Sequence, residues 1–265
     1  GPVRIGNQAH EHFQHDTYGN IILGAAPAFF DKRLFMNTGK AAFEHLEALG
    51  EQAWLLHDQP DAGLWELRSR SRIHTSSSLM CWVACDRLGK IAAHLGLPKR
   101  ATYWKERADI IRAKILERTW SEKRQSFVES FDGSTLDASV LLMGEVGFLP
   151  PQDPRFVATV ETLSATLGRG PFMLRYEEAD DFGVPEVGFN LCAFWRVDAL
   201  TRIGRKDEAR DLFEALLDAR NPLGLMSEDT SFATGEAWGN FPQTYSMAGI
   251  INGAMRLSRP WEEEL

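Results

Sequence analysis

The stretch that indicates the architecture most clearly spans residues 76–98 and reads SSSLMCWVACDRLGKIAAHLGLP. Its apolar side chains surround a whole helix, and Gly96 and Pro98 then mark a helix stop. The next stretch, residues 99–118, is apolar on one face only. That face consists of Trp104, Ala108, Ile111 and Ile115. A helix that is apolar all round must be covered on several sides, and an amphipathic helix can cover it.

The same alternation of very apolar and amphipathic helices continues along the chain. The spacing of apolar residues predicts nine helices, over residues 6–29, 38–57, 76–95, 99–118, 137–146, 153–167, 188–203, 206–219 and 242–257. We expect Thr38 to cap the second helix and Ser76 or Ser77 to cap the third. Little strand is expected: residues 127–133 suggest a short hairpin or a strand followed by a turn, and Arg68, Arg70 and Arg72 alternate as in an extended strand. The pattern therefore predicts an all-α fold with inner and outer helices.

The composition is that of a globular protein with an acidic balance. The chain has 265 residues, enough for one large domain with a buried core. Its formal net charge is −8 and it shows no basic stripe, which argues against a nucleic-acid partner. No apolar run is long enough to span a membrane, so we expect no membrane partner either.

Cysteine usage and motifs bear on location and cofactors. Cys81, Cys85 and Cys192 lie in apolar helical stretches without a CxxC spacing, which is typical of reduced, buried thiols in a cytoplasmic protein. Cys81 and Cys85 are one helical turn apart, so a two-ligand metal site is a weaker alternative. No P-loop or dinucleotide fingerprint is present, and the sequence implies neither a metal nor an organic cofactor. Residues 74–78 have the residue types of a nucleophilic site but no nucleophile elbow.

Two loops combine a carboxylate with an aromatic side chain. Residues 60–66 read PDAGLWE and place Glu66 directly after Trp65. Residues 235–243 read GEAWGNFPQ and place Glu236 near Trp238. A sugar site needs a flat apolar face on which the ring can stack and an acid beside it. We therefore expect the two loops to face each other across one pocket.

Two glutamates on facing loops predict glycoside hydrolysis. One carboxyl group donates a proton to the leaving oxygen, and the other attacks the sugar or activates a water. Trp65 would shield the acid from water, and Arg175 would hold sugar hydroxyls with paired donors. The ordinary alternative is that Glu66 and Glu236 are surface acids, that the tryptophans fill the core and that Arg175 pairs with a nearby acid.

Several segments resemble glycoside hydrolase family 15, the family of the glucoamylases and related bacterial enzymes. Residues 60–66 resemble its general-acid segment, and residues 235–246, GEAWGNFPQTYS, resemble its general-base segment. Arg175 and Tyr176, followed by residues 188–192, resemble its sugar-binding arginine and the helix after it. Further similar segments are residues 80–87, MCWVACDR, residues 136–139, LDAS, and residues 147–150, GFLP. The resemblance extends over residues 2–258.

The resemblance implies an (α/α)6 toroid of the six-hairpin glycosidase type and inversion at the anomeric carbon. Glu66 would be the general acid, and Glu236 would be the general base acting through a water. The implied substrate contacts come from Leu64, Trp65, Arg175, Tyr176 and Trp238. The implied activity is exo-acting release of glucose from α-glucans, with an oligosaccharide or disaccharide of glucose as substrate.

The chain departs from the family pattern at its start. No β-sandwich domain and no Arg-Asp segment for the non-reducing glucose precede the recognised motifs, and nine helices are fewer than twelve. We therefore expect residues 1–265 to be the C-terminal portion of a single toroid domain, with little activity alone. An open ring would expose apolar helix faces, which favours a homodimer. Met247 stands where many bacterial relatives have His, and its role is open.

Two other functions remain open on the sequence alone. A trehalase-like hydrolase of the same family would share these motifs, and a comparison of trehalose with maltose and maltotriose distinguishes it. The chain could instead be a non-catalytic helical module that binds carbohydrate or a partner through its acidic face. Saccharide binding without turnover would identify such a module.

Overall fold

A computed structural model describes residues 12–34, 38–68, 70–180 and 183–258. The chain groups into two compact units. Unit 1 comprises residues 1–120 with 129–133, and unit 2 comprises residues 121–128 with 134–265. The predicted helix over residues 6–29 therefore lies partly outside the described residues. The single domain that we expected over residues 1–265 remains a prediction.

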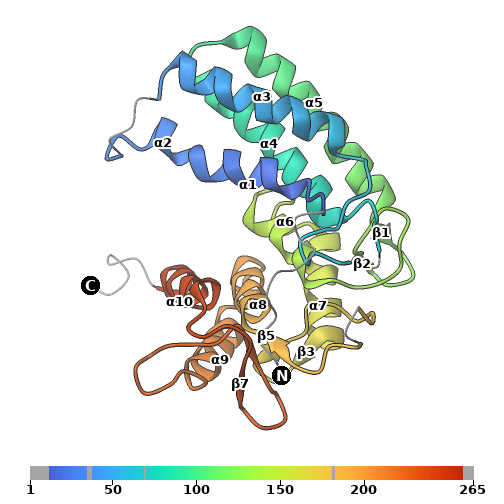
Figure 1. Ribbon diagram of the computed structural model, residues 1–265, viewed down its shortest axis with the longest axis vertical. Helices are drawn as coiled ribbons and strands as arrows, with labels where there is room; N and C mark the ends of the chain where they lie inside the picture. Colours follow the sequence, from blue (N-terminus) through green and yellow to red (C-terminus); the bar gives the residue numbers. More distant parts are fainter. Residues whose placement is uncertain (1–11, 35–37, 69, 181–182, 259–265) are drawn as a thin grey trace. The chain divides into compact units, whose positions relative to one another are not determined.

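Unit 1 is helical throughout most of its described residues (Figure 1). Its helices are α1 (Asp16–Ala25), α2 (Pro27–Phe30), α3 (Lys40–Leu56), α4 (Thr75–His94) and α5 (Pro98–Arg118). Helix α4 packs against α1, α3 and α5, and every residue from Thr75 to Cys85 is buried. Helix α5 buries one face, formed by Trp104, Ala108, Ile111 and Ile115. The predicted pair of an inner and a covering helix is therefore confirmed.

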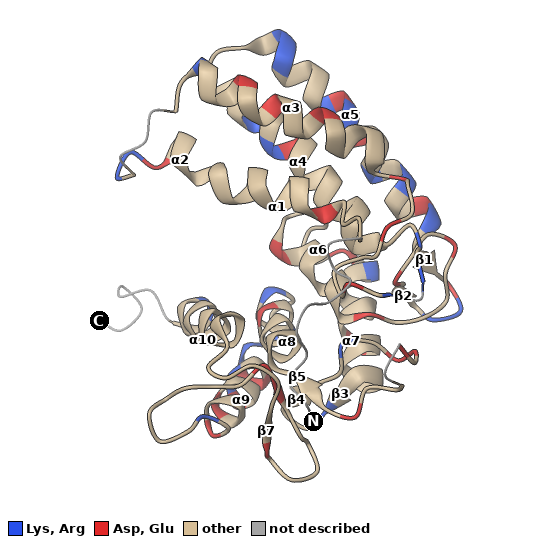
Figure 2. Cartoon of the chain, viewed as in Figure 1, with Lys and Arg blue, Asp and Glu red and all other residues tan. Residues whose placement is uncertain are grey.

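Close packing around α4 depends on glycine. A Cβ atom at Gly19 of α1 would lie 2.0 Å from the backbone oxygen of Met80. A Cβ atom at Gly50 of α3 would lie 2.2 Å from Leu88 and 2.8 Å from Trp104. Such distances are too short for any real contact, so both helices approach α4 only because these positions lack a side chain. Figure 2 shows that many charged residues of the unit lie on α3 and α5.

The start of α4 differs from the prediction. The residue before the helix is His74, and neither Ser76 nor Ser77 acts as its cap. The Ser77 hydroxyl instead donates to the carboxylate of Asp61 at 2.7 Å. The start of α4 therefore holds the neighbouring loop that contains Asp61. The predicted cap was wrong because the Ser77 hydroxyl bonds to this distant residue and not to the helix's own backbone.

Two other boundaries also differ from the prediction. Gly39, and not Thr38, immediately precedes α3, and it makes no side-chain cap. The strand expected within residues 127–133 begins earlier, as β2 (Ser126–Phe127), which pairs with β1 (Trp120–Ser121). The turn after it lies at residues 131–132, as the sequence indicated.

Unit 2 combines helices with very short strands. Its helices are η2 (Ala138–Leu141), α6 (Leu142–Glu145), α7 (Pro154–Leu167), α8 (Asn190–Arg202), α9 (Lys206–Leu217) and α10 (Thr244–Leu257). Its other strands are β3 (Gly168–Arg169), β4 (Phe172–Met173), β5 (Gly188–Phe189), β6 (Asp229–Thr230) and β7 (Ala237–Trp238). Helix α8 packs against α9 and α10, and strands β5, β6 and β7 form one antiparallel sheet.

Two sequence predictions concern the oxidation state of the cysteines and the absence of membrane-spanning helices. All three cysteines are free and buried, as predicted. Within the described ranges, no helix has both the length and the apolar character needed to cross a bilayer. The cytoplasmic location and the homodimer remain predictions.

Candidate active site

A tight turn in unit 1 carries Glu66. The Glu66 amide donates to the carbonyl of Gly63 at 3.2 Å, and the Leu67 amide donates to the carbonyl of Ala62 at 3.0 Å. Gly63 and Glu66 both have left-handed backbone, with φ of +69° and +54°. That conformation suits glycine but costs about 1 kcal/mol or more for other residues. A non-glycine residue held there is a feature that clusters at functional sites.

The carboxylate of Glu66 is exposed, whereas Leu64 and Trp65 are half-buried. Among the described residues, Trp65 therefore leaves the Glu66 side chain exposed, and the shielding that the sequence suggested remains a prediction. A pocket of about 300 Å³ adjoins the turn. Its lining includes Pro60, Asp61, Ala62 and Leu67. The Glu66 side chain is thus exposed at the surface of the turn, whereas Ala62 and Leu67 at the two ends of the turn are buried.

Arg175 in unit 2 lies over aromatic rings. Its guanidinium carbon is 5.7 Å from the centre of the Tyr176 ring and 5.4 Å from that of Phe189. Tyr176 is buried, its hydroxyl bonds to the carboxylate of Asp180, and burial raises its pKa. This environment suits Tyr176 as a support for Arg175 better than as a direct sugar contact.

One face of the three-stranded sheet gathers the recognition groups of unit 2. Phe189 pairs with Asp229 in register, and Asp229 pairs with Trp238. Directly opposed residues of an antiparallel sheet project to the same side. Arg175 lies over the Phe189 ring. The guanidinium of Arg175, the carboxylate of Asp229 and the half-exposed indole of Trp238 therefore form one row on this face of the sheet. A sugar can be held by such a row through stacking and hydroxyl hydrogen bonds.

Glu236 lies on the hairpin that ends in β7. Its backbone carbonyl accepts from the Ser231 amide at 2.9 Å, and its amide donates to the Thr234 hydroxyl at 3.3 Å. The side chain is exposed, and among the described residues its carboxylate has no hydrogen-bonding partner. The hairpin places Glu236 two residues before Trp238, but nothing in the described chain orients its carboxylate.

Glu228, which the sequence analysis did not single out, is a more ordered carboxylate. Its Oε2 atom accepts from the backbone amide and the side-chain Nδ2 of Asn240 at 3.0 and 2.8 Å. A Cβ atom at Gly239 would lie 2.7 Å from that oxygen, so only glycine permits this arrangement. Fixed hydrogen-bond partners are what a group acting on a substrate needs in order to be positioned before reaction.

Asp229, next in the chain, has an unusual environment. Burial raises the pKa of its carboxyl to about 6, while the charge of Arg175 opposes this shift and that of Glu228 adds to it. Its Oδ1 atom is buried without a hydrogen-bond partner among the described residues. A half-buried acid with a raised pKa beside a cation is typical of a functional site.

A buried asparagine fixes the segment that carries these acids. The Asn190 amide donates to the carbonyl of Glu228 at 3.0 Å, and its Nδ2 donates to the carbonyl of Ser227 at 2.9 Å. The hydroxyl of Thr230 donates to Asn190 Oδ1 at 3.0 Å. Asn190 is fully buried, so the start of α8 holds residues 227–230, at and just before β6, through three hydrogen bonds.

Two glycines of the hairpin provide a matched test of this arrangement. Gly239 and Gly235 both have φ of +73°, but only Gly239 faces the carboxylates, since a Cβ atom at Gly235 meets nothing within 4 Å. We expect Gly235→Ala to cost about 1 kcal/mol of stability from backbone strain alone. Gly239→Ala should in addition displace Glu228 and lower activity about tenfold or more. Equal activity in the two variants, measured beside their unfolding curves, would contradict an ordered role for Glu228.

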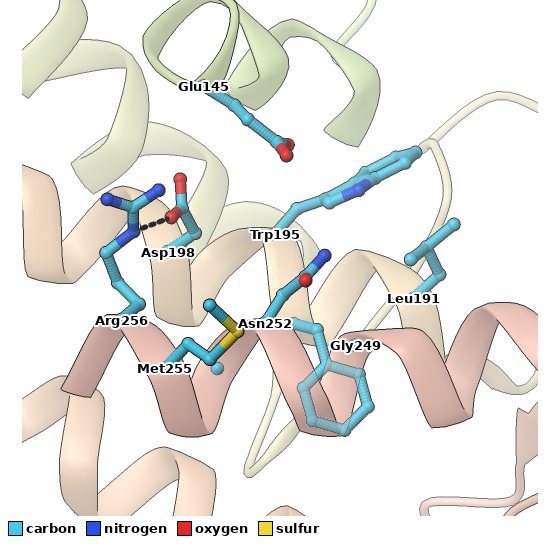
Figure 3. Close-up of a pocket in the computed structure, with 10 residues that line it drawn as sticks. Glu145, Leu191, Trp195, Asp198, Gly249, Asn252, Met255 and Arg256 are labelled. Atoms are coloured by element: carbon cyan, nitrogen blue, oxygen red, sulfur yellow. Dashed lines mark hydrogen bonds and ion pairs between the residues drawn. The ribbon is translucent and has the colours of Figure 1, made fainter. Parts of the chain in front are cut away.

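A second pocket in unit 2 lies between α6, α8 and α10 (Figure 3). It has a volume of about 300 Å³, and its lining includes Glu145, Trp195, Asp198 and Arg256. Burial, followed by the charge of Asp198, raises the pKa of Glu145, and Asp198 is paired with Arg256 at 2.7 Å. None of the seven site residues predicted from the sequence lines this pocket. In the described part of the chain, no three His, Cys, Asp or Glu side chains form a group that could hold a metal ion.

The chain is similar to known proteins over nearly its whole length. The sequence profile of glycosyl hydrolases family 15 matches residues 1–255, so the chain belongs to this family. A trehalase from Mycolicibacterium smegmatis is 37% identical over 265 residues, which are 99% of this chain and 39% of that protein. Further curated relatives from Mycobacterium tuberculosis and Thermoplasma volcanium are also named trehalase. The chain therefore spans about two fifths of the length of these relatives.

Solved structures show the fold class. A glycosidase in complex with glucose superimposes with a TM-score of 0.75 and 17% identity, covering 96% of this chain and 69% of that one. A bacterial glucoamylase complexed with acarbose gives a TM-score of 0.71 and 14% identity, covering 92% of this chain and 41% of that one. The helical fold of the six-hairpin glycosidase type that we expected is confirmed.

The set of residues that lies together in unit 2 thus differs from the set that the sequence predicted for one pocket. Unit 2 brings together Arg175 and Trp238, which the sequence named, with Asp229 and Glu228, which it did not. Leu64, Trp65 and Glu66 lie together in unit 1. The signal that could have found Glu228 is the acidic pair at residues 228–229 followed by Gly239 and Asn240 just after the facing strand.

Proposed function

We propose that this chain carries the acid and base carboxylates of an inverting hydrolase that cleaves trehalose. The supporting observation is the row of Arg175, Asp229 and Trp238 on one sheet face, beside the ordered carboxylate of Glu228. The row offers a stacking surface and paired donors for one glucose ring. Glu66, on its strained turn, is the proposed general acid.

The chemistry needs one proton and one water. Trehalose consists of two glucose units joined through their anomeric carbons. Glu66 donates its proton to the bridging oxygen, and the bond from that oxygen to the anomeric carbon breaks. A carboxylate on the opposite side takes a proton from water, whose oxygen attacks that carbon. An inverting pair leaves about 6.5–9.5 Å between the two carboxyl groups for this water.

Two glutamates of unit 2 are candidates for the base. Glu236 matches the segment that resembles the family's base, but its carboxylate is exposed and unoriented in the described chain. Glu228 accepts two hydrogen bonds from Asn240 and neighbours the row that would bind sugar. Because a base must be positioned before it acts, we propose Glu228 and keep Glu236 as the alternative.

The relatives favour trehalose over α-glucans. The sequence alone led first to exo-acting release of glucose from α-glucans, with a trehalase-like enzyme as the alternative. Curated relatives at 37% and 31% identity are named trehalase, which supports the alternative. The natural full-length protein should hydrolyse trehalose with a kcat/KM at least about tenfold above those for maltose and maltotriose. A preference for maltotriose would instead support the glucoamylase-like activity.

A further inference from the structure

A buried cluster of charged side chains in unit 1 lies against the turn that carries Glu66. His74 immediately precedes α4, and its Nδ1 atom lies 2.8 Å from the carboxylate of Asp61. Its Nε2 atom lies 3.5 Å from the carboxylate of Glu129. His74, Asp61 and Glu129 have exposed fractions of only 3%, 2% and 5%, so solvent screens none of these charges.

The geometry favours two protons on the His74 ring, since Nδ1 lies at hydrogen-bonding distance from Asp61 and Nε2 lies in ion-pair contact with Glu129, without a hydrogen bond. Both ring nitrogens face carboxylate oxygens, and an ionised carboxylate only accepts hydrogen bonds. The other oxygens of the two acids are also occupied by donors at hydrogen-bonding distance. These donors are Ser77 Oγ at 2.7 Å and the His15 amide at 2.9 Å for Asp61, and Arg72 at 2.8 Å for Glu129. Two carboxylates therefore balance one imidazolium and one guanidinium.

The pKa values agree with this protonation. Burial lowers the pKa of His74, but the hydrogen bonds and charges of Asp61 and Glu129 outweigh burial and raise it from 6.5 to about 9. Burial raises the pKa of Asp61, but its hydrogen bonds and the charge of His74 lower it overall. Nearby acids are Asp16, whose pKa burial and the Asp61 charge raise, and Cys81, whose pKa burial raises.

The His74 ring supports the backbone of the turn. A Cβ atom at Gly63 would lie 2.9 Å from the Nδ1, Cγ and Cε1 atoms of His74, so the imidazole packs directly against this residue. Asp61 lies at the start of the turn. Its amide donates to the Arg72 carbonyl at 2.9 Å, and its carbonyl accepts from the Arg72 amide at 3.2 Å. The side chain of Gln14 donates to the Gly63 carbonyl at 3.1 Å. The turn is thus held at its start, through Asp61, and at Gly63, which contacts the imidazole ring of His74.

We propose that His74 is a positioning residue: as an imidazolium held between Asp61 and Glu129, it keeps the turn in the conformation that presents Glu66. This inference rests on the proposed acid role of Glu66. The left-handed backbone of Glu66 persists only where its surroundings impose it. Removal of the proton from His74 loses a charged hydrogen bond and leaves two buried carboxylates with one cation, so the turn loosens.

The direction of the pH dependence follows from the pKa. The pKa of His74 in the folded protein lies above its unfolded value of 6.5, so its stabilisation is complete below that pH. The stabilisation is lost as the pH rises through about 9. Order in the turn and the turnover rate should therefore share an alkaline limb in this range.

Amide hydrogen exchange tests this without any substrate. In the natural full-length protein, corrected protection of residues 62–67 should be highest below about pH 6.5, fall as the pH rises from there through about 9, and be about tenfold or more lower above pH 9. His74→Gln, which cannot carry the charge, should show the lower protection at every pH, with α5 unchanged. His45→Gln removes an exposed histidine of α3 and should behave as wild type. In trehalose hydrolysis, His74→Gln should lower kcat about tenfold with KM changed less than about threefold.

The outcomes separate this inference from the proposed function. Protection of residues 62–67 that stays constant to about pH 10 in the wild type overturns the inference, whether or not the enzyme turns over trehalose. Unchanged protection in His74→Gln overturns it as well. If His74→Gln does not fold, the wild-type pH series alone decides. Absence of turnover in a wild type that shows the expected exchange limb would contradict the proposed function but not the role of His74 in the turn.

Discussion

Glu66→Gln is expected to lower kcat/KM for trehalose by about a thousandfold, within the range of general acid catalysis. The amide has the shape of the carboxyl group but cannot donate its proton to the bridging oxygen. Glucose is a poor leaving group without that proton. Because Glu66 is exposed, the free energy of unfolding should change by less than about 0.5 kcal/mol.

The control separates acid chemistry from a general loss of the site. α-Glucosyl fluoride releases fluoride, which needs no proton, so Glu66→Gln should retain most of its activity on this substrate. Glu106→Gln changes an exposed glutamate of α5 and should leave both activities unchanged. Equal losses on trehalose and on the fluoride would contradict the acid role of Glu66, as would full trehalase activity in the variant.

The second large effect concerns the base. Glu228→Gln should lower kcat for trehalose by about a hundredfold or more, because the water that attacks the anomeric carbon loses its proton acceptor. The loss should persist on α-glucosyl fluoride, since that reaction still needs the water. Gln can keep one hydrogen bond to Asn240, so folding should be little affected.

Glu236→Gln serves as the matched comparison, since it lies on the same hairpin. Its carboxylate has no ordered partner in the described chain, and we expect a loss of less than about fivefold. A large loss in Glu236→Gln with little effect of Glu228→Gln would reverse the assignment and support the base suggested by the sequence. Steady-state kinetics of the two variants on both substrates decide between them.

Local sequence patterns predicted the helices well but not their first residues. The four apolar residues of α5 recur at helical spacing, and the burial of α4 on all sides follows from its composition. The start of α4 could not be predicted because Ser77 bonds to Asp61 and the Thr75 amide bonds to Glu129, both through tertiary contacts. Local propensity contains no information on partners that distant in sequence.

The proposed site was predictable where one short motif carries it and not where the fold brings distant residues together. Glu66 stands out because its turn combines Pro, Gly and an aromatic within seven residues. The pairing of His74 with Glu129 joins residues 55 positions apart, and neither has a local signature. Glu228 was missed because its order depends on Asn240 across the hairpin and on Asn190 from α8.

The most direct test of the central claim is the anomeric form of the first products. An inverting hydrolase adds water to the anomeric carbon whose bond breaks, while the other glucose keeps its configuration. Proton NMR at early times, before mutarotation, should therefore show equal amounts of α- and β-glucose from trehalose. Release of α-glucose alone would show retention and would contradict the assignment of an acid and a water-activating base to this chain.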